Sequence, residues 1–205
     1  MERALEDGAD IIEMDIVLSR DSILLLHHYP IPSLRGRYVR RKEAGIWLEQ
    51  GLTPLSVALD RLNNRTPIYL DIKDSHITAE ALYAVVTPRH NNKVVVGSPK
   101  PSLLAAIKEV CPGWTINLHC FAVGYTLRLA ERAKADWVNP IPFAAPWSLD
   151  IRQSFAHRVI SNGYRFVPGD PRIFQKHLQY AQWGAHALST LQPKELRTFL
   201  QNNLG

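Results

Sequence analysis

Four short junctions of small residues recur along the chain, each where a helix-like segment gives way to an extended one. They are Glu6-Asp7-Gly8-Ala9-Asp10, Ala133-Lys134-Ala135-Asp136, Ser161-Asn162-Gly163-Tyr164 and Gln182-Trp183-Gly184-Ala185-His186. Repeated helix-to-strand punctuation of this kind is typical of βα units with parallel strands. No linker or low-complexity tract interrupts the pattern. The sequence therefore predicts a single α/β domain over residues 1–205.

Apolar runs and helical spacing place the individual elements. We expect strands at 11–18, 22–26, 67–73, 94–96, 114–120, 136–139, 164–167 and 187–190, and a tight turn at Asp21-Ser22. We expect helices at 52–63, 75–86, 101–110, 126–134, 151–161, 173–183 and 194–203. About seven strands alternating with helices favour a TIM-type (β/α)8 barrel over an open sheet.

Composition excludes several classes of protein. Two cysteines, Cys111 and Cys120, cannot staple a chain of 205 residues, and their spacing is not that of metal ligands, so we expect unpaired thiols. No apolar run approaches the ~20 residues of a membrane span, and no signal-peptide core follows Met1. The sequence leaves the compartment open, with the cytoplasm favoured, and it does not give the oligomeric state. A net charge of +5 is compatible with a phosphate-bearing partner.

Two carboxylates stand close together in the first expected strand. Residues two apart on a strand point to the same face, so Glu13 and Asp15 project side by side. Such carboxylates repel each other unless a cation or a shared proton separates them, and a hard divalent ion bound by oxygen is the usual solution. The alternative is an edge strand that carries two solvated acids.

Asp71 and Lys73 repeat this geometry within the strand expected at 67–73. A buried unpaired acid is costly, so Asp71 requires a partner, which a metal ion or Lys73 would supply. A plain structural ion pair is the alternative. Charged side chains at the carboxyl ends of barrel strands are typical of active sites in such folds.

Two histidines follow the second expected strand. Adjacent residues on an extended chain face opposite ways, so only one of His27 and His28 can enter a site beside the acids. An imidazole there is suited to general acid or base catalysis because its pKa lies near neutrality. A surface or packing role is the alternative.

These segments together resemble the glycerophosphodiester phosphodiesterase family. The family has a small-residue turn, Glu-x-Asp, a Thr/Ser-x-Asp-Gly turn, then an apolar triplet and a catalytic histidine. The similar segments here are Gly8 to Asp15, Ser19-Arg20-Asp21, Leu24-Leu25-Leu26-His27-His28, Leu52-Thr53-Pro54-Leu55, Tyr69-Leu70-Asp71-Ile72-Lys73, Val94 to Ser98 and Thr190 to Leu196. Ser22 stands where the family usually has glycine.

The resemblance implies a fold and a chemistry. The family has a (β/α)8 barrel and hydrolyses glycerophosphodiesters to glycerol 3-phosphate and an alcohol, using Mg²⁺ or Ca²⁺. Carried over by motif, Glu13, Asp15 and Asp71 would bind the metal, His28 would be catalytic and Lys73 would bind the substrate phosphate. The expected partner is thus a small phosphodiester.

The sequence also departs from the family pattern. The family's opening strand with His-Arg-Gly has no counterpart, and Met1 to Leu5 resembles the helix that follows that strand. With 205 residues against a typical ~250, we expect a barrel that lacks its first strand. Tyr29 follows His28 where the family has Asp, and the late motifs read Val167-Pro168-Gly169-Asp170 and Thr190-Leu191-Gln192-Pro193. A truncated or degenerate relative that binds metal or phosphate without turnover is therefore an alternative.

The remaining conspicuous residues have simpler interpretations. The basic run, Arg35, Arg37, Arg40, Arg41 and Lys42, would serve a polyanion-binding module, but no aromatic platform accompanies it; a solvated loop is expected, and no nucleic-acid partner. His119 lies in an expected strand and could point into the mouth of the barrel, but a structural histidine is favoured. Trp114, Trp137, Trp147 and Trp183 are expected to pack in the core or at its rim.

Overall fold

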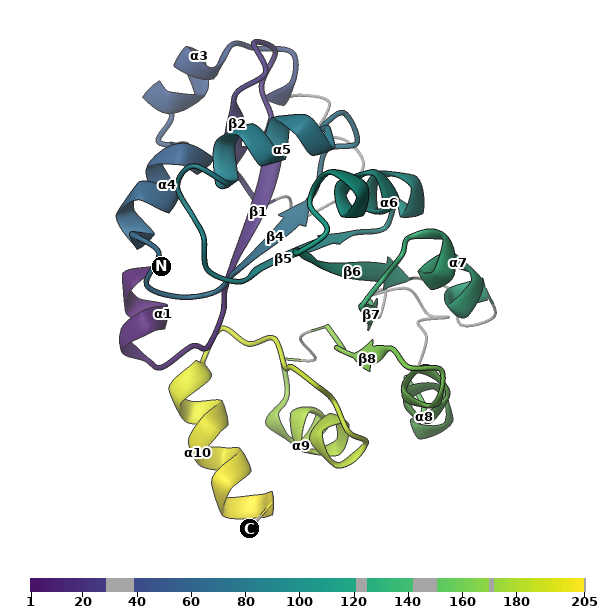
Figure 1. Ribbon diagram of the computed structural model, residues 1–205. Helices are drawn as coiled ribbons and strands as arrows, with labels where there is room; N and C mark the ends of the chain where they lie inside the picture. Colours follow the sequence, from purple (N-terminus) through teal and green to yellow (C-terminus); the bar gives the residue numbers. More distant parts are fainter. Residues whose placement is uncertain (29–38, 121–124, 142–150, 170–171, 205) are drawn as a thin grey trace.

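A computed structural model describes residues 1–28, 39–120, 125–141, 151–169 and 172–204 (Figure 1). Within these ranges eight strands form one sheet in the order β3-β2-β1-β4-β5-β6-β7-β8. The strands are β1 Ile12–Leu18, β2 Leu24–Leu26, β3 Thr53–Pro54, β4 Ile68–Ile72, β5 Val94–Ser98, β6 Thr115–Cys120, β7 Trp137–Pro140 and β8 Arg165–Phe166. From β1 through β4 to β8 the pairing is parallel, whereas β2 and β3 extend the sheet antiparallel. The parallel α/β architecture of an incomplete TIM-type barrel is confirmed.

Helices cover the outer face of this curved sheet (Figure 1). They are α1 Glu2–Glu6, α3 Ala44–Glu49, α4 Leu55–Leu62, α5 Ala79–Val86, α6 Pro101–Val110, α7 Thr126–Arg132, α8 Gln153–Ser161, α9 Phe174–Gln182 and α10 Pro193–Leu204. Local chemistry sets some ends: Thr78 Oγ1 accepts a hydrogen bond from Ala81 N at the start of α5, and Pro101 opens α6. None of the described helices is both long and apolar enough to cross a membrane.

The four small-residue junctions share one backbone geometry. Each contains a residue with positive φ: Gly8 (81°), Lys134 (51°), Gly163 (84°) and Gly184 (86°). In each, the next amide bonds back to the carbonyl five residues earlier, as in Ala9 N to Ala4 O and Ala185 N to Tyr180 O, both 2.9 Å. This is the Schellman motif, which satisfies the last helical carbonyls and turns the chain toward the next strand. The predicted helix-to-strand punctuation is confirmed at Gly8, Lys134 and Gly163, which lead into β1, β7 and β8, whereas no strand follows Gly184. Lys134 adopts the left-handed conformation without being glycine.

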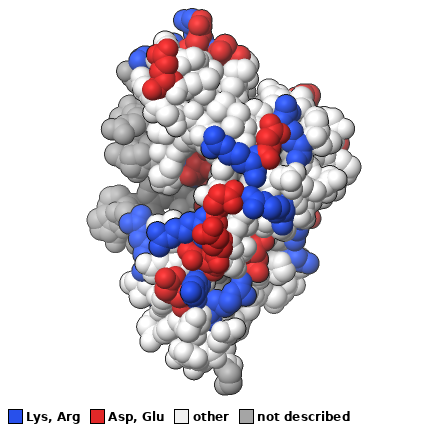
Figure 2. Space-filling model, turned by 90° about the vertical axis from the view of Figure 1, so that its left-hand side faces the viewer, with Lys and Arg blue, Asp and Glu red and all other residues white. Residues whose placement is uncertain are grey.

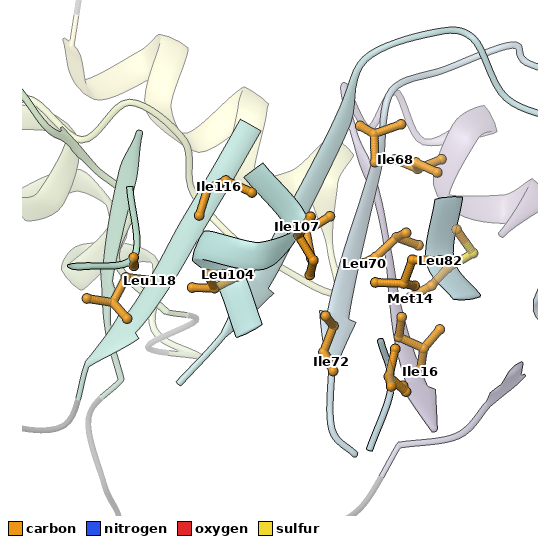
Figure 3. Packing of buried hydrophobic residues seen from close by; sticks show 14 of the residues in the cluster. Met14, Ile16, Ile68, Leu70, Ile72, Leu82, Leu104, Ile107, Ile116 and Leu118 are labelled. Atoms are coloured by element: carbon orange, nitrogen blue, oxygen red, sulfur yellow. The ribbon is translucent and has the colours of Figure 1, made fainter. Parts of the chain in front are cut away.

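The main hydrophobic core lies between the sheet and its helices. Alternate residues of each strand point outward, and Figure 3 shows Leu82 of α5 beside Leu70 and Met14, and Leu104 and Ile107 of α6 beside the neighbouring strands. All five are at most 4% exposed. At roughly 1.5–3 kcal/mol for each fully buried aliphatic side chain, this layer is the principal source of stability.

The other face of the strands lines the inside of the curved sheet, and register aligns its polar residues in a row. Asp15 of β1 pairs with Asp71 of β4, which pairs with Gly97 of β5, which pairs with Asn117 of β6. A smaller apolar group, Val95, Trp137 and Val167 with Tyr69 packed against it, lies on the same face. The inner face is thus apolar in one part and strongly polar in another.

The strand predicted at 187–190 is not a strand in the structure. His186 N donates to Phe166 O at 2.8 Å, but no ladder follows, and no described strand flanks this segment on its other side. Extended residues become a strand only when a partner pairs with them. The helix that follows this segment, α10, contacts the residues just before β1: Arg197 donates to Gly8 O at 2.8 Å and lies 3.1 Å from Asp10 Oδ2.

Charges on the face that carries α1 are mixed. Figure 2 shows acidic and basic side chains interspersed over this face. On α1, Arg3 lies 3.6 Å from Asp7, and Arg65 lies 2.8 Å from Glu2. The small positive excess of the chain is therefore not gathered into one basic patch on this face.

Candidate metal centre

Three carboxylates converge inside the sheet: Asp71 lies near the carboxyl end of β4, and Glu13 and Asp15 lie in the first four residues of the adjacent strand β1. One oxygen from each of Glu13, Asp15 and Asp71 lies within 4.8 Å of the others. Glu13 is an exposed residue, but neighbouring protein groups partly desolvate its carboxylate. This desolvation, together with the negative charges of Asp15 and then Asp71, raises the pKa of Glu13 to about 7 from its ordinary 4.5. The three predicted ligands are thus brought together in one electrostatically strained cluster.

Lys73 reaches into this cluster from the end of β4. Its Nζ lies 2.9 Å from Asp15 Oδ1 and 2.5 Å from Asp71 Oδ2. Burial would lower the pKa of Lys73, but the two carboxylates outweigh that effect and raise it. Lys73 therefore stays charged and neutralises part of the cluster, so the predicted acid–lysine pairing on one strand face is present.

His28 meets the cluster through the hairpin that joins β1 to β2. Ser19 N donates to Ile23 O at 3.0 Å, and Ser22 adopts φ of 63°, the left-handed conformation that favours glycine. The returning chain is then anchored by His27 N, which donates to Asp15 O at 3.0 Å. His28 Nδ1 consequently lies 2.6 Å from Asp15 Oδ2 while its side chain remains 73% exposed.

Buried polar residues that were not predicted as part of the site lie behind Asp71. His119 is buried, and its Nδ1 lies 3.7 Å from Asp71 Oδ1. Its Nε2 lies 2.6 Å from the Tyr69 hydroxyl, which also accepts from Asn117 Nδ2 at 2.8 Å. His119 therefore lies against a predicted metal ligand. The sequence does contain a hint of this group. Residues two apart on a strand share a face, so Asn117 shares a face with His119, and Tyr69 shares a face with Asp71.

The residues present fit a hard divalent cation. Three carboxylates supply the oxygen ligands that Mg²⁺ and Ca²⁺ prefer. Asp71 Oδ1 is buried and has no hydrogen-bond donor among the described residues, so it has an unsatisfied acceptor. Lys73 contacts Asp15 Oδ1 and Asp71 Oδ2, so it leaves Asp71 Oδ1 open and supplies one positive charge beside the three carboxyl groups.

Other singled-out residues lie away from this cluster. Arg35, Arg37 and Trp147 fall outside the described residues. Lys42 lies 5.3 Å from the centre of the Trp47 ring. Cys111 and Cys120 are buried and unpaired, as predicted. Of the described tryptophans, Trp137 is buried, and Trp114 and Trp183 are partly buried and packed against the main core.

A cavity of about 480 Å³ lies at the opposite end of the sheet. Its lining comes from the amino ends of the strands and includes Lys93, Trp114, Trp137 and Arg165. The carboxylate cluster lies toward the carboxyl ends, where α/β barrels hold their reactive groups. Position and chemistry both assign the candidate site to the cluster rather than to this cavity.

Fold and cluster together define an α/β barrel-type protein with a carboxylate centre toward the carboxyl ends of its parallel strands. No protein-family model matches the sequence, and comparison with curated proteins gives no match. Solved structures do match. The Oleispira antarctica phosphodiesterase in complex with the product sn-glycerol-3-phosphate has a TM-score of 0.79 and 13% identity, covering 97% of this chain and 88% of that one.

Two further solved structures bear the family name. The glycerophosphodiester phosphodiesterase from Thermotoga maritima has a TM-score of 0.67 and 18% identity over 96% of this chain and 88% of that one. The enzyme of that name from Agrobacterium tumefaciens has a TM-score of 0.69 and 14% identity over 96% and 90%. The chain thus has the fold of the glycerophosphodiester phosphodiesterases, as its sequence resemblance implied.

Proposed function

We propose that this protein hydrolyses a glycerophosphodiester to glycerol 3-phosphate and an alcohol, with a divalent cation held by Glu13, Asp15 and Asp71. The observation that carries the proposal is the convergence of these three carboxylates within 4.8 Å at the end of the sheet where such folds act. The fold shared with phosphodiesterases supports the substrate class. Mg²⁺ and Ca²⁺ are the candidate ions.

A bound cation would draw negative charge away from the phosphodiester and make phosphorus more electrophilic. Lys73 adds a second positive charge beside the same position, anchored by Asp15 and Asp71. An ammonium group held by two carboxylates is preorganised, so it stabilises charge that develops on a phosphate oxygen without first having to be oriented. This is the phosphate-binding role assigned to Lys73.

His28 is the proton-transfer group in this proposal. Asp15 Oδ2 engages its Nδ1, which leaves Nε2 as the nitrogen available to substrate. Nε2 would move a proton at the attacking group or at the oxygen of the departing alcohol. Asp15 therefore serves twice, as a cation ligand and as the group that orients the imidazole, and its loss should be the most damaging.

The test is release of glycerol 3-phosphate from glycerophosphocholine with added Mg²⁺ or Ca²⁺. His28→Ala and Asp15→Asn should lose turnover by roughly 10²-fold or more, the usual contribution of a positioned proton-transfer group. The matched controls are His157→Ala and Asp60→Asn, whose side chains are exposed on α8 and α4 and which should leave the rate unchanged. Equal rates in His28→Ala and His157→Ala would contradict the role of His28.

A second candidate is a relative that binds metal or phosphate without turnover. A departure of this sequence from the family pattern favours it, because Tyr29 follows His28 where the family has Asp. Cation binding that requires Asp15 and Asp71, with no glycerol 3-phosphate released by the wild type under any of these conditions, would identify this second candidate.

A further inference from the structure

The Tyr69 hydroxyl lies at the centre of a buried polar network behind the carboxylate cluster. Asn117 Nδ2 donates to it at 2.8 Å. The carbonyl oxygen of Asn117 is buried without a hydrogen-bond partner among the described residues, in keeping with an amide that turns its NH₂ group toward the hydroxyl. Tyr69 therefore accepts a hydrogen bond from Asn117.

Counting donors and acceptors fixes where the tyrosine proton goes. A phenolic hydroxyl has one proton to donate and can also accept a hydrogen bond. The Asn117 NH₂ group can only donate, so among the hydrogen-bond partners of this hydroxyl in the described residues the acceptor for its proton is His119 Nε2, which lies 2.6 Å away. An Nε2 that accepts a hydrogen bond is unprotonated, so a neutral His119 carries its proton on Nδ1.

That Nδ1 faces a predicted metal ligand. It lies 3.7 Å from Asp71 Oδ1, and both side chains are buried. The separation exceeds a hydrogen bond, so the N–H acts on the carboxylate through its dipole in this arrangement. On the other side, Lys73 Nζ lies 2.5 Å from Asp71 Oδ2. The Asp71 carboxylate is thus held between an ammonium group and an imidazole N–H.

Gly97 provides the space that this network occupies. A Cβ at position 97 would lie 2.6 Å from His119 Nε2 and closer still to the Tyr69 hydroxyl. No side chain larger than hydrogen fits there while Tyr69 and His119 remain in contact. The glycine follows three buried valines in the buried strand Val94–Ser98 and stands at the position paired with Asp71.

We propose that His119 is a positioning residue: Tyr69 locks it in the Nδ1–H tautomer, and this N–H orients the Asp71 carboxylate toward the cation. The role of the cation rests on the proposed function, whereas the tautomer does not. Groups that orient metal ligands from behind typically contribute about 10- to 100-fold in metal affinity. His119 itself is not a ligand in this scheme, because a protonated Nδ1 cannot coordinate.

The tautomer is measured directly by ¹⁵N–¹H correlation spectra of the imidazole rings. The eight histidines are distinguished by the signals lost in His119→Asn. The wild type should show the Nδ1–H pattern for His119, and Tyr69→Phe, which removes only the hydroxyl, should convert it wholly or partly to Nε2–H. Tyr164→Phe, at the amino end of β8, is the matched control and should leave it unchanged. An Nε2–H tautomer in the wild type overturns the proposal.

Cation affinity tests the positioning role. With Ca²⁺ or Mg²⁺ alone, Tyr69→Phe and His119→Leu should bind about 10- to 100-fold more weakly than the wild type. His119→Asn should retain more affinity than His119→Leu, because its amide nitrogen takes the place of Nδ1–H. Equal affinity in wild type and Tyr69→Phe overturns the positioning role. A wild type that binds no divalent ion contradicts the proposed function and removes this role with it. An Nε2–H tautomer together with tight ion binding overturns the role proposed for His119 and leaves the proposed function standing.

Discussion

Asp15 and Asp71 occupy directly paired positions on the adjacent parallel strands β1 and β4, with their side chains on the inner face of the sheet. Residues placed side by side in a sheet have side chains close enough to interact strongly, and like charges there are destabilising. The chain compensates with Lys73, whose Nζ contacts both carboxylates. Like-charged pairs that oppose stability are typical of functional sites, so the Asp15–Asp71 pair supports a functional role for this cluster.

Removing the Lys73 ammonium group should leave the repulsion between Asp15 and Asp71 uncompensated and destabilise the fold. In Lys73→Met the two carboxylates lose their shared cation, so we expect the free energy of unfolding to fall by roughly 1–3 kcal/mol in EDTA. Saturating Ca²⁺ should restore part of the loss, because a divalent ion neutralises the same oxygens. Urea unfolding with and without Ca²⁺ measures both effects. Lys134→Met, which removes an exposed partner of Glu109 at 2.9 Å, is the control and should change little.

The raised pKa of Glu13 predicts a pH dependence of stability. Its pKa is about 7 in the folded chain against an ordinary 4.5, so the folded state binds the extra proton between these values. Stability contributed by protonated Glu13 is therefore lost as pH rises from about 4.5 through 7. Glu13→Gln should be more stable than the wild type at pH 8 in EDTA, with the difference shrinking toward pH 5. Urea midpoints that differ equally at both pH values would contradict the assignment.

Gly97→Ala should disturb the network of Tyr69 and His119. The added methyl group overlaps both side chains, and overpacking of this kind costs about 1–3 kcal/mol. The expected result is a lower urea midpoint together with weaker cation binding. Gly45→Ala is the control, because a Cβ there meets nothing within 4 Å. Unchanged stability and affinity in Gly97→Ala would show that the close packing at this position is not as described.

Arg197 should matter for stability but not for the site. It joins α10 to the start of β1 through Gly8 O and Asp10. Arg197→Ala should lower the free energy of unfolding by about 0.5–1.5 kcal/mol, the net value of one hydrogen bond, since the accompanying ion pair is exposed. Cation affinity should stay at the wild-type value. A large loss of affinity would mean that this contact also shapes the carboxylate cluster.

Much of the fold and the site follows from local sequence signals. The spacing of Glu13 and Asp15, and of Asp71 and Lys73, determines which face each side chain takes, and three of the four small-residue junctions lead into a strand. The strand expected at 187–190 was wrong because strand formation depends on a neighbour, which composition cannot reveal. The contact of His119 with Tyr69 joins residues 50 positions apart and depends on register and on the space left by Gly97. The spacing of residues in the sequence predicts neither the register between strands nor the space beside Gly97.

The most direct test of the central claim is calorimetric titration of the metal-free protein with Ca²⁺ and with Mg²⁺, comparing the wild type, Asp71→Asn and Asp60→Asn. The account predicts that the wild type and Asp60→Asn bind one divalent ion per chain with the same affinity. Asp71→Asn keeps the side-chain shape but loses a charged ligand, so its binding should be strongly weakened. Equal binding by wild type and Asp71→Asn, or no binding by the wild type, would contradict the account.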